Sequence, residues 1–148
     1  MRQTMKQPEY QKYMVQLQRS ENSPRSTVRV RNFHLEVGTT SGDPNAGFNP
    51  AETILSAVGG CITSSFLLVA KNSDVSVGAL SVEVSGFRQS MPPQLVSVTF
   101  ILSIQSPAED EKIDRLMSIA ERNSTVISTL RKAIPVIGSW NRLSQDIL

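Results

Sequence analysis

The feature that most constrains the fold is an uncharged stretch of eighteen residues, Thr53 to Ala70, near the middle of the chain. A helix of this composition is apolar on nearly every side, so it belongs at the centre of a globular protein or in a membrane. Two adjacent glycines, Gly59 and Gly60, and five serine or threonine residues interrupt it. The other segments have the patterns of soluble structure. The sequence therefore favours a buried core helix and no membrane span, with a spanning helix as the alternative, because hydropathy alone does not separate the two.

The composition is that of one globular domain. Of the 148 residues, 39% are hydrophobic and 19% are charged, which is typical of chains that bury a sizeable core. We therefore predict a single domain over residues 1–148. The formal net charge is only +2 and the basic residues form no tract, which argues against a nucleic-acid partner. The N-terminal residues lack the apolar core of a secretory signal, so we expect a cytoplasmic protein.

The chain contains one cysteine, Cys61, and one histidine, His34. One cysteine excludes an intramolecular disulfide, and the two residues together cannot fill a Cys/His zinc site. We expect neither a metal nor another cofactor. Cys61 lies inside the uncharged stretch, directly after the glycine pair. From the residues alone it is either a small apolar filler, as free cysteines often are, or a reactive thiol.

The segments before the core helix have strand patterns. Apolar and polar residues alternate within residues 13–18 and again within residues 27–37. In the second segment the alternation shifts by one residue near Arg31, which predicts a bulge or a turn. Arg29 and Arg31 alternate with valines, so we expect both on one face of the strand. A loop rich in glycine and proline, residues 38–50, leads into the helix.

The segments after the core helix alternate between strands and helices. Strand patterns occupy residues 75–87 and 95–104, separated by a turn with two prolines. The next helix has Ser106 as its predicted N-cap, Pro107 at its first position and Glu109 completing a capping box. Its buried stripe is predicted at Ile113, Leu116, Met117 and Ala120.

The C-terminal part of the chain completes the pattern. Residues 123–133 predict a further short helix, and residues 134–140 predict a closing strand. Strands, a buried helix, more strands and then helices indicate an α+β protein.

Three motifs are similar to those of one known family. Asn49-Pro50 opens the apolar helix, and Cys61 follows eleven residues after the proline. Residues 75–89 resemble a pair of strands that follows such a helix. Residues 120–130, "AERNSTVISTL", resemble a segment written "AE, two residues, Cys-Pro-Val". Over residues 27–140 the chain thus resembles the OsmC/Ohr family, named after osmotically inducible protein C and organic hydroperoxide resistance protein.

The resemblance implies curved antiparallel sheets wrapped around central helices in an intertwined homodimer. An energetic argument agrees with the dimer. One small sheet cannot cover a helix that is apolar on all sides, and two-fold pairing would bury the remainder.

The resemblance also implies a chemistry for Cys61. Similar proteins use the helix cysteine as a thiolate that attacks a peroxide and becomes a sulfenic acid. A second cysteine then closes a disulfide, which reductants reopen. An arginine from the N-terminal strands stabilises the thiolate, and a glutamate directly after Asn-Pro holds that arginine. In this chain Arg29 and Arg31 are the candidates for the cation, with Arg19 and Arg25 also possible. Their alternative role is that of solvated surface charges.

The chain departs from the family pattern at two positions. Ser124 stands where the second cysteine is expected, and Ala51 stands where the glutamate is expected, with Glu52 as the nearest carboxylate. Serine cannot form a disulfide, so any sulfenic acid at Cys61 has to be reduced by an external thiol. We expect Ser124 to lie near Cys61 and to cap the short helix that follows it.

Two functions from different classes follow. The first is a one-cysteine thiol peroxidase that acts on organic hydroperoxides with an external thiol as reductant. The second is a non-catalytic relative that binds a small apolar ligand at the dimer interface. A hydrolase with Ser124 as nucleophile would need a base, and His34 is the only histidine, so this third chemistry is disfavoured.

Overall fold

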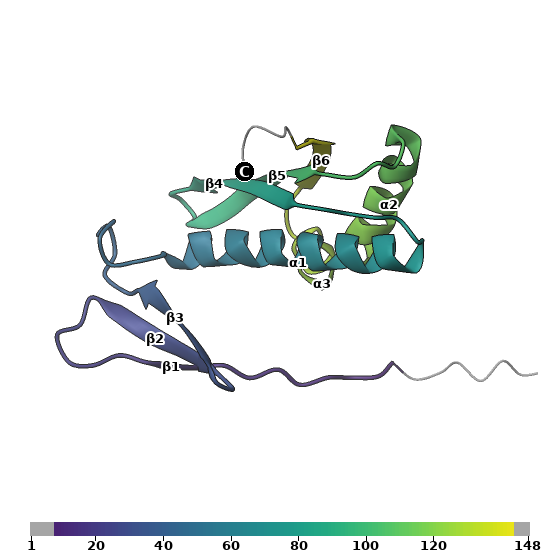
Figure 1. Cartoon of the computed structure of the whole chain (residues 1–148). Coiled ribbons are helices and arrows are strands. Elements are labelled where there is room, and N and C mark those ends of the chain that lie inside the picture. Colours follow the sequence, from purple (N-terminus) through teal and green to yellow (C-terminus); the bar gives the residue numbers. More distant parts are fainter. Residues whose placement is uncertain (1–7, 144–148) are drawn as a thin grey trace, which may run out of the picture. The chain divides into compact units, whose positions relative to one another are not determined.

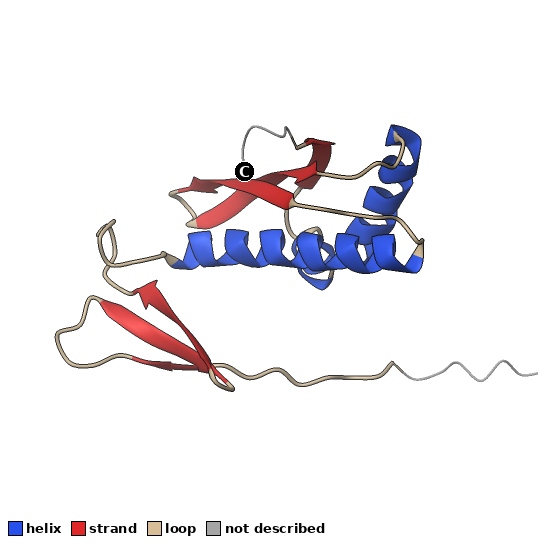
Figure 2. Ribbon diagram, in the orientation of Figure 1, coloured by secondary structure: helices blue, strands red, loops and turns tan. Residues whose placement is uncertain are grey.

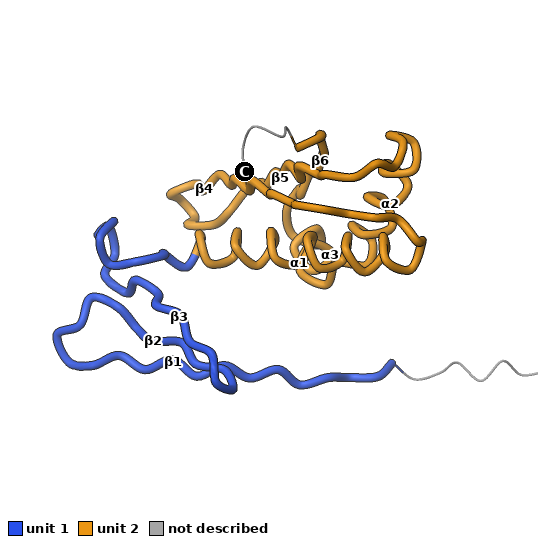
Figure 3. The backbone as a smooth tube through the Cα atoms, viewed as in Figure 1, with its two compact units in different colours: residues 1–50 blue, residues 51–148 orange. Residues whose placement is uncertain are grey.

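The computed structural model describes residues 8–143 (Figure 1), and the chain separates into two compact units, residues 1–50 and 51–148 (Figure 3). Each unit is described by itself. The expectation of one domain over residues 1–148 stays a prediction.

The first unit is an antiparallel sheet of three strands in the order β1-β2-β3. Its strands are β1 (Gln16–Gln18), β2 (Arg25–Val30) and β3 (Phe33–Gly38). β2 and β3 form a hairpin in which Val30 pairs with Phe33. Arg31, with a φ of 51°, begins the turn between them. The shift in alternation therefore marks a turn, one of the two features that the sequence predicted.

The two faces of this sheet differ in polarity. Leu17, Val28 and Leu35 lie in one row across the three strands, and Gln16, Arg29 and His34 lie in the next. Because side chains alternate along a strand, the first row belongs to an apolar face and the second to a polar face. The expectation that Arg29 and Arg31 share a strand face is wrong, because Arg31 lies in the turn rather than in β2.

The uncharged stretch forms the helix α1 (Pro50–Asn72), as predicted. Among residues 8–143, it is the helix that is long and apolar enough to cross a membrane, a test that the core helix of a soluble protein also passes. One face of α1 is buried within its own unit, at Val58, Gly59, Ile62, Phe66, Val69 and Ala70. The structure thus gives α1 a core face, which agrees with the favoured prediction.

The second unit places α1 along a three-stranded sheet with the order β4-β5-β6 (Figure 2). Its strands are β4 (Leu80–Gln89), β5 (Gln94–Ile104) and β6 (Val136–Arg142). β4 and β5 are antiparallel, whereas β5 and β6 are parallel. The expected antiparallel sheets therefore include one parallel pair. Parallel neighbours need a crossover connection, and the helices α2 (Asp110–Asn123) and α3 (Thr125–Leu130) provide it.

The core lies between the inner face of this sheet and the helices. Val98, Phe100, Leu102 and Ile104, which alternate along β5, are all at most 1% exposed. They pack with the buried face of α1 and with the apolar stripe of α2. That stripe is Ile113, Leu116, Met117 and Ala120, as the helical periodicity predicted.

The predicted start of α2 is wrong. The helix begins at Asp110 with Glu109 as its N-cap, and no side chain caps it. The hydroxyl of Ser106 instead donates a hydrogen bond of 2.6 Å to the backbone carbonyl of Ser76 and accepts one from the backbone N–H of Ala108. A tertiary contact between two segments thus uses the side chain that local sequence assigned to the cap.

We predict that Gly138→Ala destabilises the protein by about 1–3 kcal/mol, the usual range for overpacking a core. Gly138 lies opposite Phe100 in the register of β5 and β6. A Cβ at this position would collide with the Phe100 ring and would lie 2.7 Å from Oε1 of Glu121. Urea unfolding measures the loss. The control is Ser139→Ala at the next, exposed position, for which we expect almost no change. Equal stability of the two variants would show that the ring has room to move.

Candidate functional site

Cys61 lies in the middle of α1, at the border between the helix's buried and exposed faces. Its side chain is half-buried. The residue before it, Gly60, is exposed, and a Cβ added there would have nothing within 4 Å in this chain. Gly59 faces the other way, and a Cβ there would come within 3.2 Å of Val82 and 3.3 Å of Val84. Gly59 therefore allows the strand β4 to pack closely against α1, whereas no atom of residues 8–143 packs against Gly60 in this way.

Ser124 lies at the junction of α2 and α3, and its side chain is in contact with Cys61. The Ser124 Oγ donates a hydrogen bond of 2.9 Å to the Cys61 Sγ, although the two residues are 63 positions apart. The same oxygen accepts a 3.4 Å hydrogen bond from the backbone N–H of Ile127, which makes Ser124 the N-cap of α3. Ser124 is 0% exposed. The expected proximity to Cys61 and the expected cap are both confirmed.

An ion pair holds the α2–α3 junction in place. The backbone N–H of Ser124 donates to the carbonyl of Glu121, and the carboxylate of Glu121 pairs with Arg131 at 2.7 Å. The Arg131 guanidinium also donates to the backbone carbonyl of Val136 from two nitrogens, at 3.0 and 2.8 Å. Residues from α2, the end of α3 and the start of β6 are thus tied together around Ser124. Sequence reasoning missed Arg131, because no local pattern indicates that it reaches back across the junction.

The two candidate arginines lie in the first unit, in different local settings. Arg29 is an exposed residue on the polar face of β2, opposite His34. Arg31 lies in the turn, with its guanidinium carbon 5.9 Å from the centre of the Phe33 ring. Phe33 lies on the apolar face of the sheet. Arg31 therefore extends toward that face, whereas Arg29 does not. The other two candidates contact backbone carbonyls: Arg19 that of Ser23, and Arg25 that of Asn45.

Glu52 lies in the first turn of α1, nine residues before Cys61. Nine residues of an ideal helix correspond to about 13 Å along the axis and to about 180° of rotation. Glu52 therefore projects from the side of α1 opposite Cys61. A side chain in this position does not reach the thiol of its own chain.

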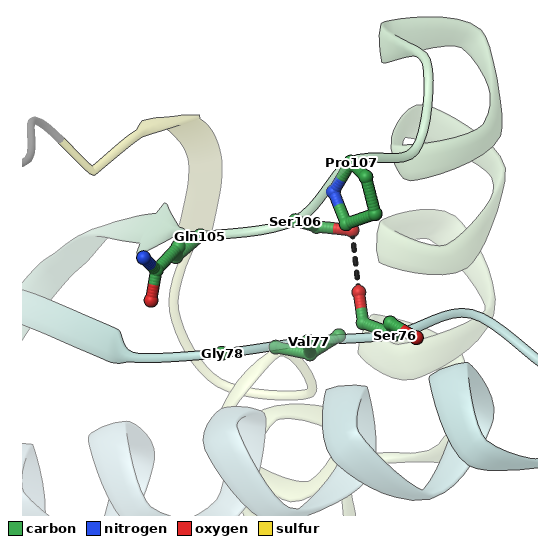
Figure 4. A pocket seen from close by; sticks show the side chains of 6 residues that line it. All are labelled: Ser76, Val77, Gly78, Gln105, Ser106 and Pro107. Atoms are coloured by element: carbon green, nitrogen blue, oxygen red, sulfur yellow. Dashed lines mark hydrogen bonds between the residues drawn. The ribbon is translucent and has the colours of Figure 1, made fainter.

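The remaining features of the described residues do not add catalytic groups. A shallow hollow lies between the segments that precede β4 and follow β5, lined by Ser76, Val77, Gly78, Gln105, Ser106 and Pro107 (Figure 4). Two of its side chains bond to backbone groups: Gln105 Oε1 accepts from the N–H of Ala79, and the Ser106 hydroxyl donates to the carbonyl of Ser76. Among residues 8–143, no three His, Cys, Asp or Glu side chains gather in a group that could hold a metal.

The arrangement at Cys61 limits its chemistry. A thiol with a neighbouring hydroxyl can form a sulfenic acid but no intramolecular disulfide. A serine nucleophile would need a base, and the hydroxyl of Ser124 instead donates to sulfur. The site is therefore built around the sulfur of Cys61, with the oxygen of Ser124 as its donor.

Comparisons with known proteins agree with the fold. Residues 40–137 match a family model described as OsmC-like protein. A similar solved structure is that of an OsmC-like protein from Mycoplasma pneumoniae, at 20% identity and a TM-score of 0.77, covering 89% of this chain and 99% of that one. No curated protein matches the sequence.

Two further structures are named for organic hydroperoxide resistance. The protein from Legionella pneumophila is 15% identical with a TM-score of 0.71, covering 87% of this chain and 97% of its own. OhrB of Bacillus subtilis is 15% identical with a TM-score of 0.66, covering 87% and 98%. At these identities the likeness concerns the fold.

We predict that Ser124→Cys forms a disulfide with Cys61 when the protein is treated with an organic hydroperoxide. The two side-chain atoms already lie 2.9 Å apart, so little movement brings two sulfurs to bonding geometry. Loss of the hydroxyl cap costs about 1 kcal/mol. Mass spectrometry should show the loss of two hydrogens and a linked peptide pair.

The control for this experiment is Ser128→Cys, one turn further along α3. Its hydroxyl contacts the backbone carbonyl of Arg122 rather than Cys61. The thiol introduced at position 128 should form no disulfide with Cys61 of the same chain. Oxidation of Cys61 to sulfinic acid, with the new thiol at position 124 still reduced, would contradict the prediction.

Proposed function

Because the chain belongs to the OsmC-like protein family, we propose that it is a one-cysteine thiol peroxidase that reduces organic hydroperoxides. The observation that carries the proposal is the 2.9 Å contact between Ser124 and Cys61. It pairs the thiol with the residue that occupies the place of the family's second cysteine. Two structural neighbours named for organic hydroperoxide resistance support the choice of substrate class.

The proposed reaction has two stages. The Cys61 thiolate attacks the terminal oxygen of the hydroperoxide, a sulfur–oxygen bond forms and the oxygen–oxygen bond breaks. The alkoxide takes a proton from water and leaves as an alcohol, and the sulfur, oxidised by two electrons, becomes a sulfenic acid. An external thiol then displaces water to give a mixed disulfide. A second external thiol releases Cys61, leaving a disulfide of the reductant.

Apolar residues on α1 support organic rather than inorganic peroxide as the substrate. Ile54 and Leu68 lie seven residues before and after Cys61, so all three project from one side of the helix. These two side chains are 41% and 59% exposed. A hydroperoxide with a hydrocarbon tail would cover them while its peroxide group meets the sulfur.

Arg31 is our first candidate for the cation that stabilises the thiolate. It extends toward the apolar face of its sheet, the face that would cover an apolar helix. Arg29 projects from the opposite face and is the second candidate. Glu52 would act through such an arginine, because its own helix directs it away from Cys61.

We further propose that the protein is a homodimer. On α1, Leu67 and Leu68 are 42% and 59% exposed. Only 33% of the most apolar 18-residue stretch of this helix is buried. The apolar face of β1-β2-β3 also carries exposed residues, with Phe33 at 68%. A second copy supplies matching surfaces for both, because each copy has one apolar helix face and one apolar sheet face. A soluble, cytoplasmic dimer then also accounts for the apolar character of α1 without a membrane.

The second candidate function is binding of a small apolar ligand without turnover. The observation that favours it is Ser124 itself, since the place of the second redox group holds a residue that cannot be oxidised to a disulfide. The exposed apolar residues on α1 would then bind the ligand.

The dimer has a direct test. At micromolar concentration, sedimentation equilibrium should give twice the chain mass of 16.3 kDa. We expect Leu68→Glu to yield monomers, because a charge on the exposed face of α1 cannot be buried without a partner. Lys71→Glu, which also introduces a glutamate at an exposed position of α1, is the control. A monomeric wild-type protein would contradict the proposal.

We predict that the wild-type protein turns over an alkyl hydroperoxide with dithiothreitol and that Cys61→Ser does not. The reason is that only the sulfur can pass through a sulfenic acid. Consumption of peroxide measures turnover, and a dimedone-type reagent traps the sulfenic acid on Cys61. Ser56→Ala, an exposed position on the same helix, should keep full activity. Absence of turnover and of the trapped product in the wild type would leave the ligand-binding function as the better account.

A further inference from the structure

We infer that the Ser124 hydroxyl is a catalytic hydrogen-bond donor to Cys61, which stabilises negative charge on the sulfur and fixes its position. This inference deepens the proposed function and rests on it. Ser124 therefore does more than fill the place of a missing cysteine.

The direction of the hydrogen bond follows from the hydroxyl's two contacts. A serine hydroxyl has one hydrogen to donate and two lone pairs that accept. The backbone N–H of Ile127 can only donate, so it occupies a lone pair of the Ser124 oxygen. Among residues 8–143, the Cys61 Sγ is the acceptor to which Ser124 Oγ donates. The hydrogen bond from Ile127 thus orients the Ser124 hydroxyl, and the hydroxyl donates its one hydrogen to the sulfur.

Burial makes this contact effective. Ser124 is 0% exposed, so water does not compete for its hydrogen. A donor aimed at an ionised group contributes roughly twice as much as a neutral pair, and a thiolate is a better acceptor than a thiol. The hydrogen bond is therefore strongest when the sulfur carries negative charge, as it does when it attacks.

The position of the donor is fixed by groups on three elements. Glu121 accepts from the backbone N–H of Ser124, and its carboxylate is held by Arg131, which also bonds the carbonyl of Val136. Ser124 is further tied to α3, because its carbonyl accepts from the N–H of Ser128 at 2.9 Å. A preorganised donor of this kind needs no rearrangement when charge appears on the sulfur.

No bond at Ser124 is made or broken in the proposed cycle. The hydroxyl keeps its hydrogen while the sulfur passes from thiolate to sulfenic acid and back. A cysteine at this position would be consumed in a disulfide, whereas the serine stays available as a donor throughout. The external thiol then attacks the Cys61 sulfur directly.

The test compares Ser124→Ala with Ser124→Gly. Both variants lack the hydroxyl, but glycine is nearly as good an N-cap as serine and alanine is a poor one. The control is Thr129→Ala, which removes a hydroxyl that bonds the Thr125 carbonyl in the same helix and does not touch Cys61. If the donor acts on the sulfur, the alanine and glycine variants will share one change in reactivity while differing in stability.

Two measurements read the contact without relying on turnover. Cys61 is the only cysteine, so the infrared spectrum contains one S–H stretching band. We expect this band to move to the same new position in both variants and to stay in place in Thr129→Ala. Alkylation of Cys61 by iodoacetamide at pH 7 should slow by about tenfold or more in both, the effect of losing a hydrogen bond to a charged group. Sulfenic acid formation with an alkyl hydroperoxide should slow in parallel.

The outcomes separate the inference from the proposed function. Unchanged S–H band and alkylation rate in both variants would overturn the donor role, even if the wild type turns over peroxide. Loss of reactivity in Ser124→Ala but not in Ser124→Gly would assign the effect to the cap and also overturn it. A shifted band and slower alkylation, with no turnover in any protein, would overturn the peroxidase function and the catalytic part of the inference, and would leave only the hydrogen bond.

Discussion

The constraint on which the second unit depends is the need to cover α1. The helix is apolar along eighteen uncharged residues, and a single small sheet reaches only part of its circumference. The inner face of β4-β5-β6 covers the side that contains Ile62 and Phe66, both 0% exposed. The connection between β5 and β6 covers a second side, because its helices pack into the same core. Cys61 lies at the border of this covered region, which gives its thiol a buried neighbour and an open side.

The parallel pairing of β5 and β6 is what brings Ser124 to Cys61. A hairpin would have joined the two strands by a few residues, whereas a parallel pair requires a crossover. The crossover contains α2 and α3, and the break between them falls where the chain passes α1. At that break the backbone of Ser124 leaves helical geometry, with φ −78° and ψ 111°, so the side chain is free to cap α3 and to contact the sulfur. Strand topology and site geometry are therefore one property of the fold.

Local patterns predicted most of the elements, and long-range contacts account for the errors. The alternation along β5 and the stripe of α2 are set by burial of one face, which a sequence shows directly. The prediction of where α2 starts was wrong because the Ser106 hydroxyl donates to the carbonyl of Ser76, thirty residues earlier, and does not cap the helix. Arg29 and Arg31 were assigned to one face because a two-residue turn is short enough to look like continued alternation. The pairing of Arg131 with Glu121 has no local signal. The contact of Ser124 with Cys61 was predictable only through the family's motif spacing.

The pairing of Ser124 with Cys61 also bears on whether the cysteine is an apolar filler. A fully buried hydroxyl that loses its acceptor leaves an unsatisfied donor, which costs about 1–3 kcal/mol. If Cys61 were only a filler, alanine at that position would fill similar space, but it would leave the Ser124 hydrogen without a partner. The described residues contain no buried side-chain polar atom without a partner, and the sulfur is what satisfies Ser124. The two residues are thus energetically coupled. As long as Ser124 is buried in this core, the thiol of Cys61 is needed as the acceptor of its hydrogen bond.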